Sequence, residues 1–551
     1  MSCIQTLNKK KTVHIEIITL VIYACALIFI MYYHEPWFDE AQAWLIARDA
    51  SIWKLLSSVT HYEGHPPIWF LILMPLAKNG VPFELGIKAV NFTFATLAMG
   101  VFIFKAPFHR LVRCTIPFTY FFFYQYGVIS RPYSLMMLGF VLSAWLYKDR
   151  NEKPFRFIAA LSLICGASAF GIVLSAGICI VWLWEIFDRS LTLEKLTSFI
   201  KSKKFNAIML LFFYNIFLMI CICPFADTLG IHVKQADPYI MRLLYMLVMA
   251  PADAICSNSF PYGSINIGLN IECLSSFILG CFINTTLYVV TKMYKKRALW
   301  IVPYFFFAVF SATAYFYSHH IGIVTMFYIF LLWCCLADRP ETIEIPQSLE
   351  RILIAVNNKK LLRYCSIMLA FLVVGIQLCW SISASKNDIA LNYGTGREVS
   401  AFISDNGLDR LKIMAAWSKT VDPNTEKTYV DFNYLQGIPS LAYFNKNIFY
   451  NFNNGINNEC YQTHKIDNEG SVMKELRSQG YPDVLLGNVD LQFIFDSEIN
   501  MRDYQLVGAI YGNTIWKDSV HKNGQFIYLR KDLLKSYPNL NKPPELQFFC
   551  T

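Results

Sequence analysis

The chain has 551 residues, of which 55% are hydrophobic and only 16% are charged. Soluble domains average about 25% charged residues, so the composition excludes an ordinary soluble protein. The aromatic content of 16% also excludes an intrinsically disordered chain. The net charge of +9 does not point to nucleic acid, because the Lys and Arg residues lie mostly in short segments between apolar runs.

Eleven apolar runs are candidates for membrane-spanning helices, each of which needs about 20 apolar residues. In chain order they are 13–32, 83–104, 115–130, 132–147, 156–171, 172–187, 205–224, 267–291, 299–317, 320–337 and 364–382. The first run is too long for a signal peptide and lacks a cleavage site, so we expect an anchor. The pattern predicts a polytopic α-helical membrane domain over residues 1–383.

Two further apolar stretches, 66–77 and 240–256, are expected not to cross. If either one crossed, every later loop would change sides, so we expect both to be interfacial helices at the outer surface. An alternative stays open in which both cross and only the loops between them are inverted.

The distribution of basic residues predicts the orientation. With the N-terminus in the cytoplasm, the inner segments carry 24 Lys and Arg residues and the outer connections carry 6. The sequons at Asn91 and Asn284 lie within expected spans, so the outer regions offer none. This favours the inner (cytoplasmic) membrane of a bacterium over the endoplasmic reticulum.

Residues 384–551 are expected to form a soluble, extracytoplasmic α/β domain. The composition changes near residue 383, and helical and strand-like segments then alternate. Helices are expected at 397–405 and 471–479, strands at 411–417 and 483–487, and one or two hairpins from 510–518 to 526–531. The domain has no Gly-rich phosphate-binding loop.

The first outer loop, residues 32–82, concentrates the residues that can perform acid–base chemistry. Its acidic and His residues between 34 and 65 are His34, Glu35, Asp39, Glu40, Asp49, His61, Glu63 and His65. One of the adjacent acids Asp39 and Glu40 could simply cap the helix that follows. Capping does not explain the second group, Glu63-Gly64-His65-Pro66-Pro67, so the loop predicts general-base catalysis on a hydroxyl or amine acceptor.

These motifs resemble those of the GT-C glycosyltransferases, and in particular the protein O-mannosyltransferase and lipid A aminoarabinose transferase group, family 39. The shared pattern is an Asp-Glu pair in the first outer loop, an acid before a His-Pro-Pro helix start, and a basic inner loop. The resemblance covers roughly residues 13–340. It implies a polyprenyl-phosphate sugar as donor, a glycan, lipid or protein as acceptor, and inversion at the anomeric carbon by a carboxylate base.

The resemblance also implies roles for single residues. Asp39 matches the catalytic acid of the first loop, and Glu40 matches its neighbour. Glu63 matches the acid ahead of the surface helix, and His65 lies within that motif. In the aminoarabinose enzymes the corresponding acid helps to bind a metal. Here Gly64 and His65 stand where those enzymes have Lys, so a divalent metal held by Glu63 and His65 stays open, and no other cofactor is expected.

Two further pairs of residues are candidates for binding the donor phosphate. Arg131 and Tyr133 lie between the third and fourth expected spans at the outer face, where a guanidinium suits a phosphate. His319 and His320 stand at the outer start of the tenth span. The alternatives are an Arg that reaches toward lipid headgroups and a His pair with a structural role.

Two other functions remain as alternatives to a transferase. A lipid-linked glycan transporter or flippase would require charges deep in the spans and internal repeats, but Lys88 and Glu272 lie near span ends and no repeat is visible. A non-catalytic GT-C relative that binds lipid-linked glycans is the other. Membrane lipid is an expected partner and nucleic acid is not.

Overall fold

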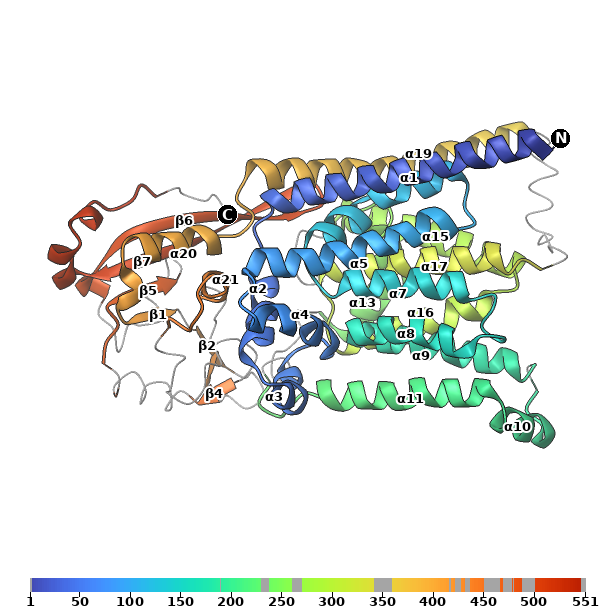
Figure 1. Ribbon diagram of the computed structural model, residues 1–551, viewed down its shortest axis with the longest axis horizontal. Coiled ribbons are helices and arrows are strands. Elements are labelled where there is room, and N and C mark those ends of the chain that lie inside the picture. Colours follow the sequence, from blue (N-terminus) through green and yellow to red (C-terminus); the bar gives the residue numbers. More distant parts are fainter. Residues whose placement is uncertain are drawn as a thin grey trace.

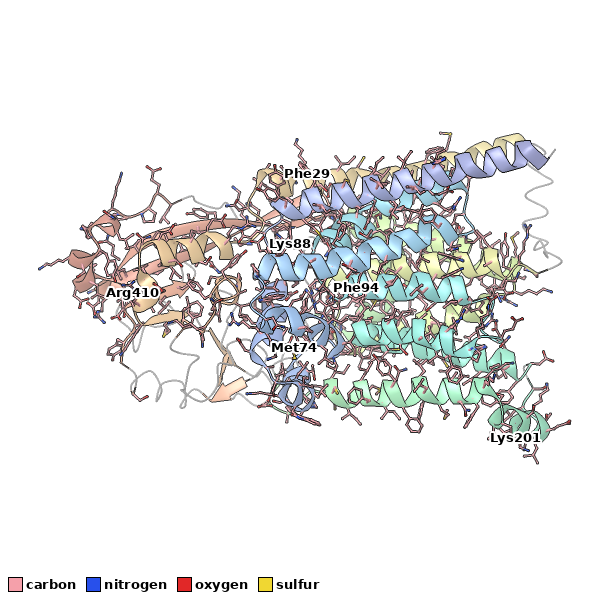
Figure 2. The ribbon with its side chains drawn as sticks, viewed as in Figure 1. Phe29, Met74, Lys88, Phe94, Lys201 and Arg410 are labelled. Carbon is pink, nitrogen blue, oxygen red and sulfur yellow. The ribbon has the colours of Figure 1, made fainter. Side chains whose placement is uncertain are left out.

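The protein consists of a long helical bundle with a smaller, sheet-containing C-terminal domain at one end (Figure 1). The structure is a computed structural model that describes residues 2–188, 190–228, 237–259, 270–340, 359–415, 418–421, 428–431, 437–449, 466–468, 478, 480–487 and 501–546. We call the bundle end that carries the C-terminal domain the proximal end and the opposite end the distal end. Figure 2 shows Lys88 near the proximal end and Lys201 at the distal end.

Long apolar helices make up the bundle. They are α1 (Ser2–Tyr33), α5 (Phe83–Lys105), α7 (Tyr133–Leu146), α8 (Pro154–Ala167), α9 (Ala169–Ile186), α11 (Lys203–Ile222), α15 (Ile271–Met293), α16 (Arg297–Thr313), α17 (Gly322–Ala337) and α19 (Lys359–Ala390). Among the described residues, six stretches are long and apolar enough to cross a membrane: His14–Tyr33, Phe83–Lys105, Ala169–Ile186, Lys203–Ile222, Ile271–Met293 and Ser318–Ala337. The apolar helices α7, α8 and α16 are shorter. The total of eleven spans therefore stays a prediction.

The lateral surface of the bundle, formed by the sides of its helices, is strongly apolar. Phe213 on α11 is 63% exposed and Ile278 on α15 is 60% exposed, with large apolar neighbours along both helices. Soluble proteins rarely expose apolar surface on this scale. The exposed apolar helices are consistent with a membrane-embedded protein.

The expected span at 115–130 is not a regular α-helix. The chain forms the short helix α6 (Arg110–Thr115), the 3₁₀ turn η2 (Ile116–Phe118) and then the π-helix η3 (Phe121–Val128), whose residues are all buried. Each of the other ten expected runs coincides with a helix of the bundle. The break expected at Gly171 lies at Ser168 instead, because the Ser168 Oγ accepts the Phe170 N–H at 3.2 Å and caps α9.

The two expected interfacial helices have different outcomes. α4 (Ile68–Lys78) has 11 residues, about 16 Å, which is too short to cross. The second stretch forms α13 (Tyr239–Leu244), the π-helix η4 (Tyr245–Met249) and α14 (Ala250–Asp253). α13 exposes apolar side chains, but residues 245–253 are largely buried and pack against α15 and α16. The expectation of a surface helix is therefore wrong for that part, which hydrogen bonds from both helices hold inside the bundle.

Two small sheets form the C-terminal domain. A four-stranded sheet has the order β1 (Ile413–Ala415), β5 (Val484–Gly487), β7 (Ser519–Arg530), β6 (Tyr504–Trp516), with β1 and β5 parallel and the other pairs antiparallel. A three-stranded antiparallel sheet contains β2 (Ser418–Val421), β3 (Thr428–Asp431) and β4 (Ile466–Asn468). The helices α20 (Gly396–Asp405) and α21 (Ile438–Leu441) accompany them. The expected helix at 397–405, the two strands and one hairpin are confirmed, and 471–479 lies almost entirely outside the described residues.

The first loop lies between the bundle and the C-terminal domain (Figure 1). It folds as α2 (Phe38–Asp49), α3 (Ile52–Ser57), the 3₁₀ turn η1 (Val59–Tyr62) and α4. Apolar residues of α2 and α4 belong to the same buried cluster as residues of α20 and β5. This shared core fixes the position of the loop on the bundle end.

Candidate functional site

The adjacent acids Asp39 and Glu40 have different surroundings at the start of α2. Glu40 is fully buried, and its Oε2 accepts the Trp37 N–H at 3.1 Å while its Oε1 accepts the Ser130 N–H at 2.6 Å. Capping, which the sequence left open for either acid, thus applies to Glu40. Its oxygens already have protein partners, so Glu40 holds the local structure together instead of facing a substrate.

His34 contacts Glu40 and connects the ends of three helices. Its Nε2 lies 3.2 Å from Glu40 and its Nδ1 lies 2.9 Å from Asp388 of α19, and all three side chains are buried. Burial alone lowers the pKa of His34, but the charges and hydrogen bonds of Asp388 and Glu40 outweigh it and raise the pKa to about 10. The imidazole is therefore a cation that joins the ends of α1, α2 and α19.

Asp39 forms an ion pair with Arg131, which is the central contact of the site. The Arg131 Nη1 donates to the Asp39 Oδ2, and the Arg131 Nη2 lies 3.0 Å from the His65 Nε2. Arg131 lies in the short connection between the π-helix η3 and α7, while His65 lies just before α4. Three segments far apart in the sequence thus meet at one guanidinium.

The hydrogen bonds of His65 define which nitrogen carries its proton. Its Nδ1 lies 3.2 Å from the Ala167 carbonyl oxygen, which can only accept, so Nδ1 is protonated. The Nε2 lone pair then accepts from Arg131. Burial lowers the pKa of His65 to about 4, which keeps the ring neutral at physiological pH. His65 therefore positions Arg131.

Glu63 comes two residues before His65 and is bound by α2. The Gln42 Nε2 donates to the Glu63 Oε1 at 2.9 Å, and Gln42 lies one helical turn after Asp39. Burial raises the pKa of Glu63 well above its usual range. The next residue, Gly64, leaves no room for a side chain, because an added Cβ would meet the phenol ring of Tyr315.

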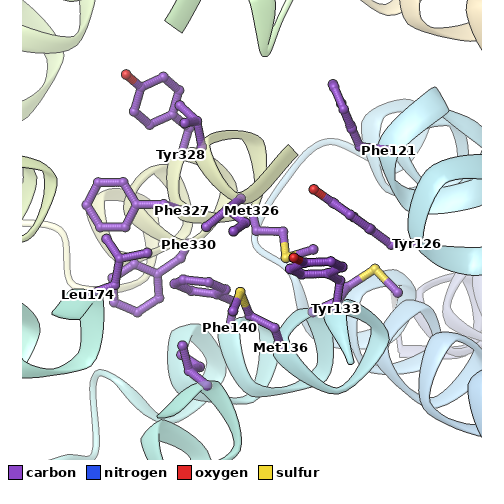
Figure 3. Packing of buried hydrophobic residues seen from close by; sticks show 14 of the residues in the cluster. Phe121, Tyr126, Tyr133, Met136, Phe140, Leu174, Met326, Phe327, Tyr328 and Phe330 are labelled. Atoms are coloured by element: carbon purple, nitrogen blue, oxygen red, sulfur yellow. The ribbon is translucent and has the colours of Figure 1, made fainter. Parts of the chain in front are cut away.

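Tyr133 packs near both Arg131 and His65. The Arg131 Cζ lies 5.6 Å from the Tyr133 ring centroid, and the His65 ring lies 5.8 Å from it. Tyr133 is 1% exposed, and its hydroxyl has no hydrogen-bond partner among the described residues. Figure 3 shows Tyr133 beside Tyr126, among apolar side chains of α7 and α17. A buried hydroxyl in this state is suited to a polar group of a ligand.

The two adjacent His residues just before α17 differ in their burial and in their contacts, as Asp39 and Glu40 do. His319 is half-buried, and its ring lies 6.5 Å from that of Trp37, next to the start of α2. His320 is 2% exposed, accepts the Tyr317 N–H at 3.0 Å through Nδ1, and packs on Phe170. His319 thus belongs to the edge of the site, and His320 has a structural role.

The structure therefore brings most of the expected residues together at the proximal end. We use the name polar cluster for Asp39, Glu63, His65, Arg131, Tyr133 and His319. Glu40 and His320 are buried next to this cluster and have structural roles.

The residues present do not fit a metal site. The described residues contain no group of three or more His, Cys, Asp and Glu side chains that could hold a metal ion. Both ring nitrogens of His65 have protein partners, and Glu63 binds Gln42. We therefore assign no metal to Glu63 and His65.

Sequence reasoning missed Gln42, Tyr315 and Asp388. Gln42 could have been found, because it stands three residues after Asp39 and so shares its helix face. Tyr315 and Asp388 carry no local signal, since their partners Gly64 and His34 are more than 250 residues away.

Comparison of the chain with protein-family models, with curated proteins and with solved structures finds no match.

Proposed function

We propose that this protein is a glycosyltransferase that moves a sugar from a polyprenyl-phosphate donor to an acceptor at the proximal end of its bundle. The observation that carries the proposal is the Asp39–Arg131–His65 constellation. It places a carboxylate and a guanidinium side by side where apolar helices end. A lipid-linked donor needs this combination, since its phosphate requires a cation and its sugar a neighbouring base.

The residues of the polar cluster other than His319, together with Gln42 and Glu40, have roles in this reaction. Arg131 contacts the donor phosphate, and Tyr133 offers its hydroxyl to a phosphate oxygen. Asp39 accepts the proton of the attacking acceptor hydroxyl or amine. The new bond forms at the anomeric carbon on the face opposite the phosphate, whose oxygen leaves with the bonding electrons. Glu63 and Gln42 position the acceptor, and Glu40 and His65 act as positioning residues.

We further propose that the proximal end faces away from the cytoplasm. Among the described residues of the helical region, most Lys and Arg side chains lie in the segments at the distal end, including Lys105, Lys148 and Lys201. Basic loops remain on the cytoplasmic side of a membrane. In a bacterium the protein would lie in the inner membrane, with the C-terminal domain outside.

Substitution of Asp39 tests the proposed base. The protein is purified in detergent and incubated with polyprenyl-phosphate sugars and a cell-envelope extract as acceptor, and released polyprenyl phosphate is measured. We expect Asp39→Asn to lower turnover by about 10²–10⁴-fold, the usual contribution of a general base. The matched control is Asp49→Asn, which changes an acid of the same helix that pairs with Arg48 instead.

Equal turnover of the Asp39→Asn and wild-type proteins would show that Asp39 is not the base. Absence of transfer by the wild-type protein with every donor, together with retained binding of the donor, would favour the non-catalytic glycan-binding alternative.

A further inference from the structure

The guanidinium of Arg131 already has an anionic partner in the ligand-free protein. Asp39 accepts from one terminal nitrogen, and the neutral His65 accepts from the other. The Arg131 side chain is only 10% exposed, so an incoming phosphate cannot simply add to a bare cation. A phosphate that binds Arg131 closely must take a place that a protein group now occupies.

Asp39 and His65 are not equally replaceable as partners of Arg131. His65 is anchored from behind by the Ala167 carbonyl and by its own position before Pro66. The Asp39 side chain is 22% exposed, at the edge of the cluster. A phosphate approaching from the solvent or headgroup side therefore meets the Asp39 carboxylate first, and Asp39 is the partner that can turn away.

We propose that the donor phosphate and Asp39 compete for Arg131, so that donor binding releases the carboxylate which then serves as the base. The inference rests on the proposed function and adds the order of events at the site. Before the donor binds, the Asp39 oxygen is held by Arg131 and does not activate an acceptor. After transfer, Asp39 carries the proton and must lose it to solvent before it can pair with Arg131 again.

Competition for Arg131 predicts an effect on phosphate affinity that a general-base role of Asp39 alone would not predict. Removing the carboxylate should strengthen phosphate binding while it abolishes transfer. We expect Asp39→Asn to bind geranylgeranyl phosphate about fivefold to tenfold more tightly than the wild-type protein, because the phosphate then meets a weaker competitor for a charge-assisted hydrogen bond. Asp49→Asn should bind with unchanged affinity.

A double-mutant cycle separates competition from plain charge repulsion between Asp39 and the phosphate. The dissociation constant for geranylgeranyl phosphate is measured with the full-length protein in nanodiscs of zwitterionic lipid. The four proteins are wild type, Asp39→Asn, Arg131→Gln and the double variant. Competition requires Arg131, so we expect no gain from Asp39→Asn in the Arg131→Gln background. Where Arg131→Gln binds too weakly to measure, Arg131→Lys replaces it, with an expected gain smaller than in the wild-type background, because the Lys ammonium holds Asp39 without the planar fork of Arg.

Two further ligands identify which part of the lipid is recognised. Geranylgeraniol lacks the phosphate and should not respond to Asp39→Asn. Inorganic phosphate lacks the chain, and a similar gain with it would show that the phosphate group alone competes.

The outcomes distinguish the two proposals. A gain that persists without Arg131, or no gain at all, overturns the competition, while the proposed function stands as long as the wild-type protein transfers sugar. Absence of binding and of transfer in the wild-type protein overturns both.

Discussion

At the scale of single residues, the role of each acid in the site depends on the group that it contacts. Asp39 and Glu40 are adjacent in the chain, but one faces Arg131 and the other faces the backbone of Trp37 and Ser130. Their order in the sequence could not reveal this, because the distinction depends on where η3 places Ser130 and Arg131. The same holds for His319 and His320.

His34 makes a contribution to the stability of the folded protein that depends on pH. Its pKa is about 10 in the folded protein and close to 6.5 when exposed, so its stabilising effect is full below pH 6.5 and is lost as the pH rises toward 10. We expect the wild-type protein to exceed His34→Asn in stability by a few kcal/mol at pH 6 and by clearly less at pH 10. Thermal unfolding in detergent at the two pH values measures the difference.

If His34→Asn does not fold, Asp388→Asn provides the test, because it removes one of the two charges that hold the proton on His34. A stability difference that is the same at both pH values would contradict a charged His34.

At the scale of elements, the site depends on departures from regular structure. The π-helix η3 ends where the backbone turns to present Ser130 and Arg131, and η1 leads into the Glu63–Pro67 turn. The sequence predicted the regular helices well, because their apolar runs are long. It did not predict η3, whose aromatic residues in 121–126 suit an ordinary helix equally well. π-Helices are short, rare and held by tertiary packing.

The turn at Gly64 allows a test of one close contact. We expect Gly64→Ala to reduce transfer, because the added Cβ would collide with Tyr315, whose ring is held against Phe170 and His320. Tyr315→Phe removes the colliding hydroxyl and one hydrogen bond to Gly64, worth about 1 kcal/mol. Activity and melting temperature are measured for both single variants and the double variant.

The double variant should lose less than the sum of the single losses, since Tyr315→Phe removes the hydroxyl with which the Cβ added at Gly64 would collide. Gly375→Ala is the control, because an added Cβ there meets nothing within 4 Å. Strictly additive losses would mean that the contact does not restrict the turn.

At the scale of the whole molecule, the first loop and the C-terminal domain form one unit. The sequence suggested two separate regions, 1–383 and 384–551, from the change in composition. It could not reveal that α2 and α4 share a core with α20 and β5, because an apolar residue does not specify its partner. An ion pair between Glu84 and Arg397 also joins the two regions.

The proposed orientation can be checked at the two ends of the bundle. Trp53 in α3 at the proximal end is 81% exposed, and Leu193 in α10 (Leu193–Ile200) at the distal end is 78% exposed. In sealed right-side-out vesicles, a membrane-impermeant maleimide should label Trp53→Cys at once and Leu193→Cys only after permeabilisation. The parent protein gives the background from its own cysteines. The reverse pattern would invert the orientation.

The tip of the β6–β7 hairpin inserts into the helical bundle and has a consequence for how the protein is made. Trp516 and Lys517 are fully buried there, with the Lys517 amine donating to the carbonyl oxygens of Asp253 and Ser257 and lying over the ring of Trp380. Translation proceeds from the N-terminus, so every helix of the bundle leaves the ribosome before this tip does. The cavity that receives the tip must stay open until then. Assembly is therefore complete only after synthesis is nearly finished, and a chain truncated before residue 516 would leave this part of the bundle unfilled.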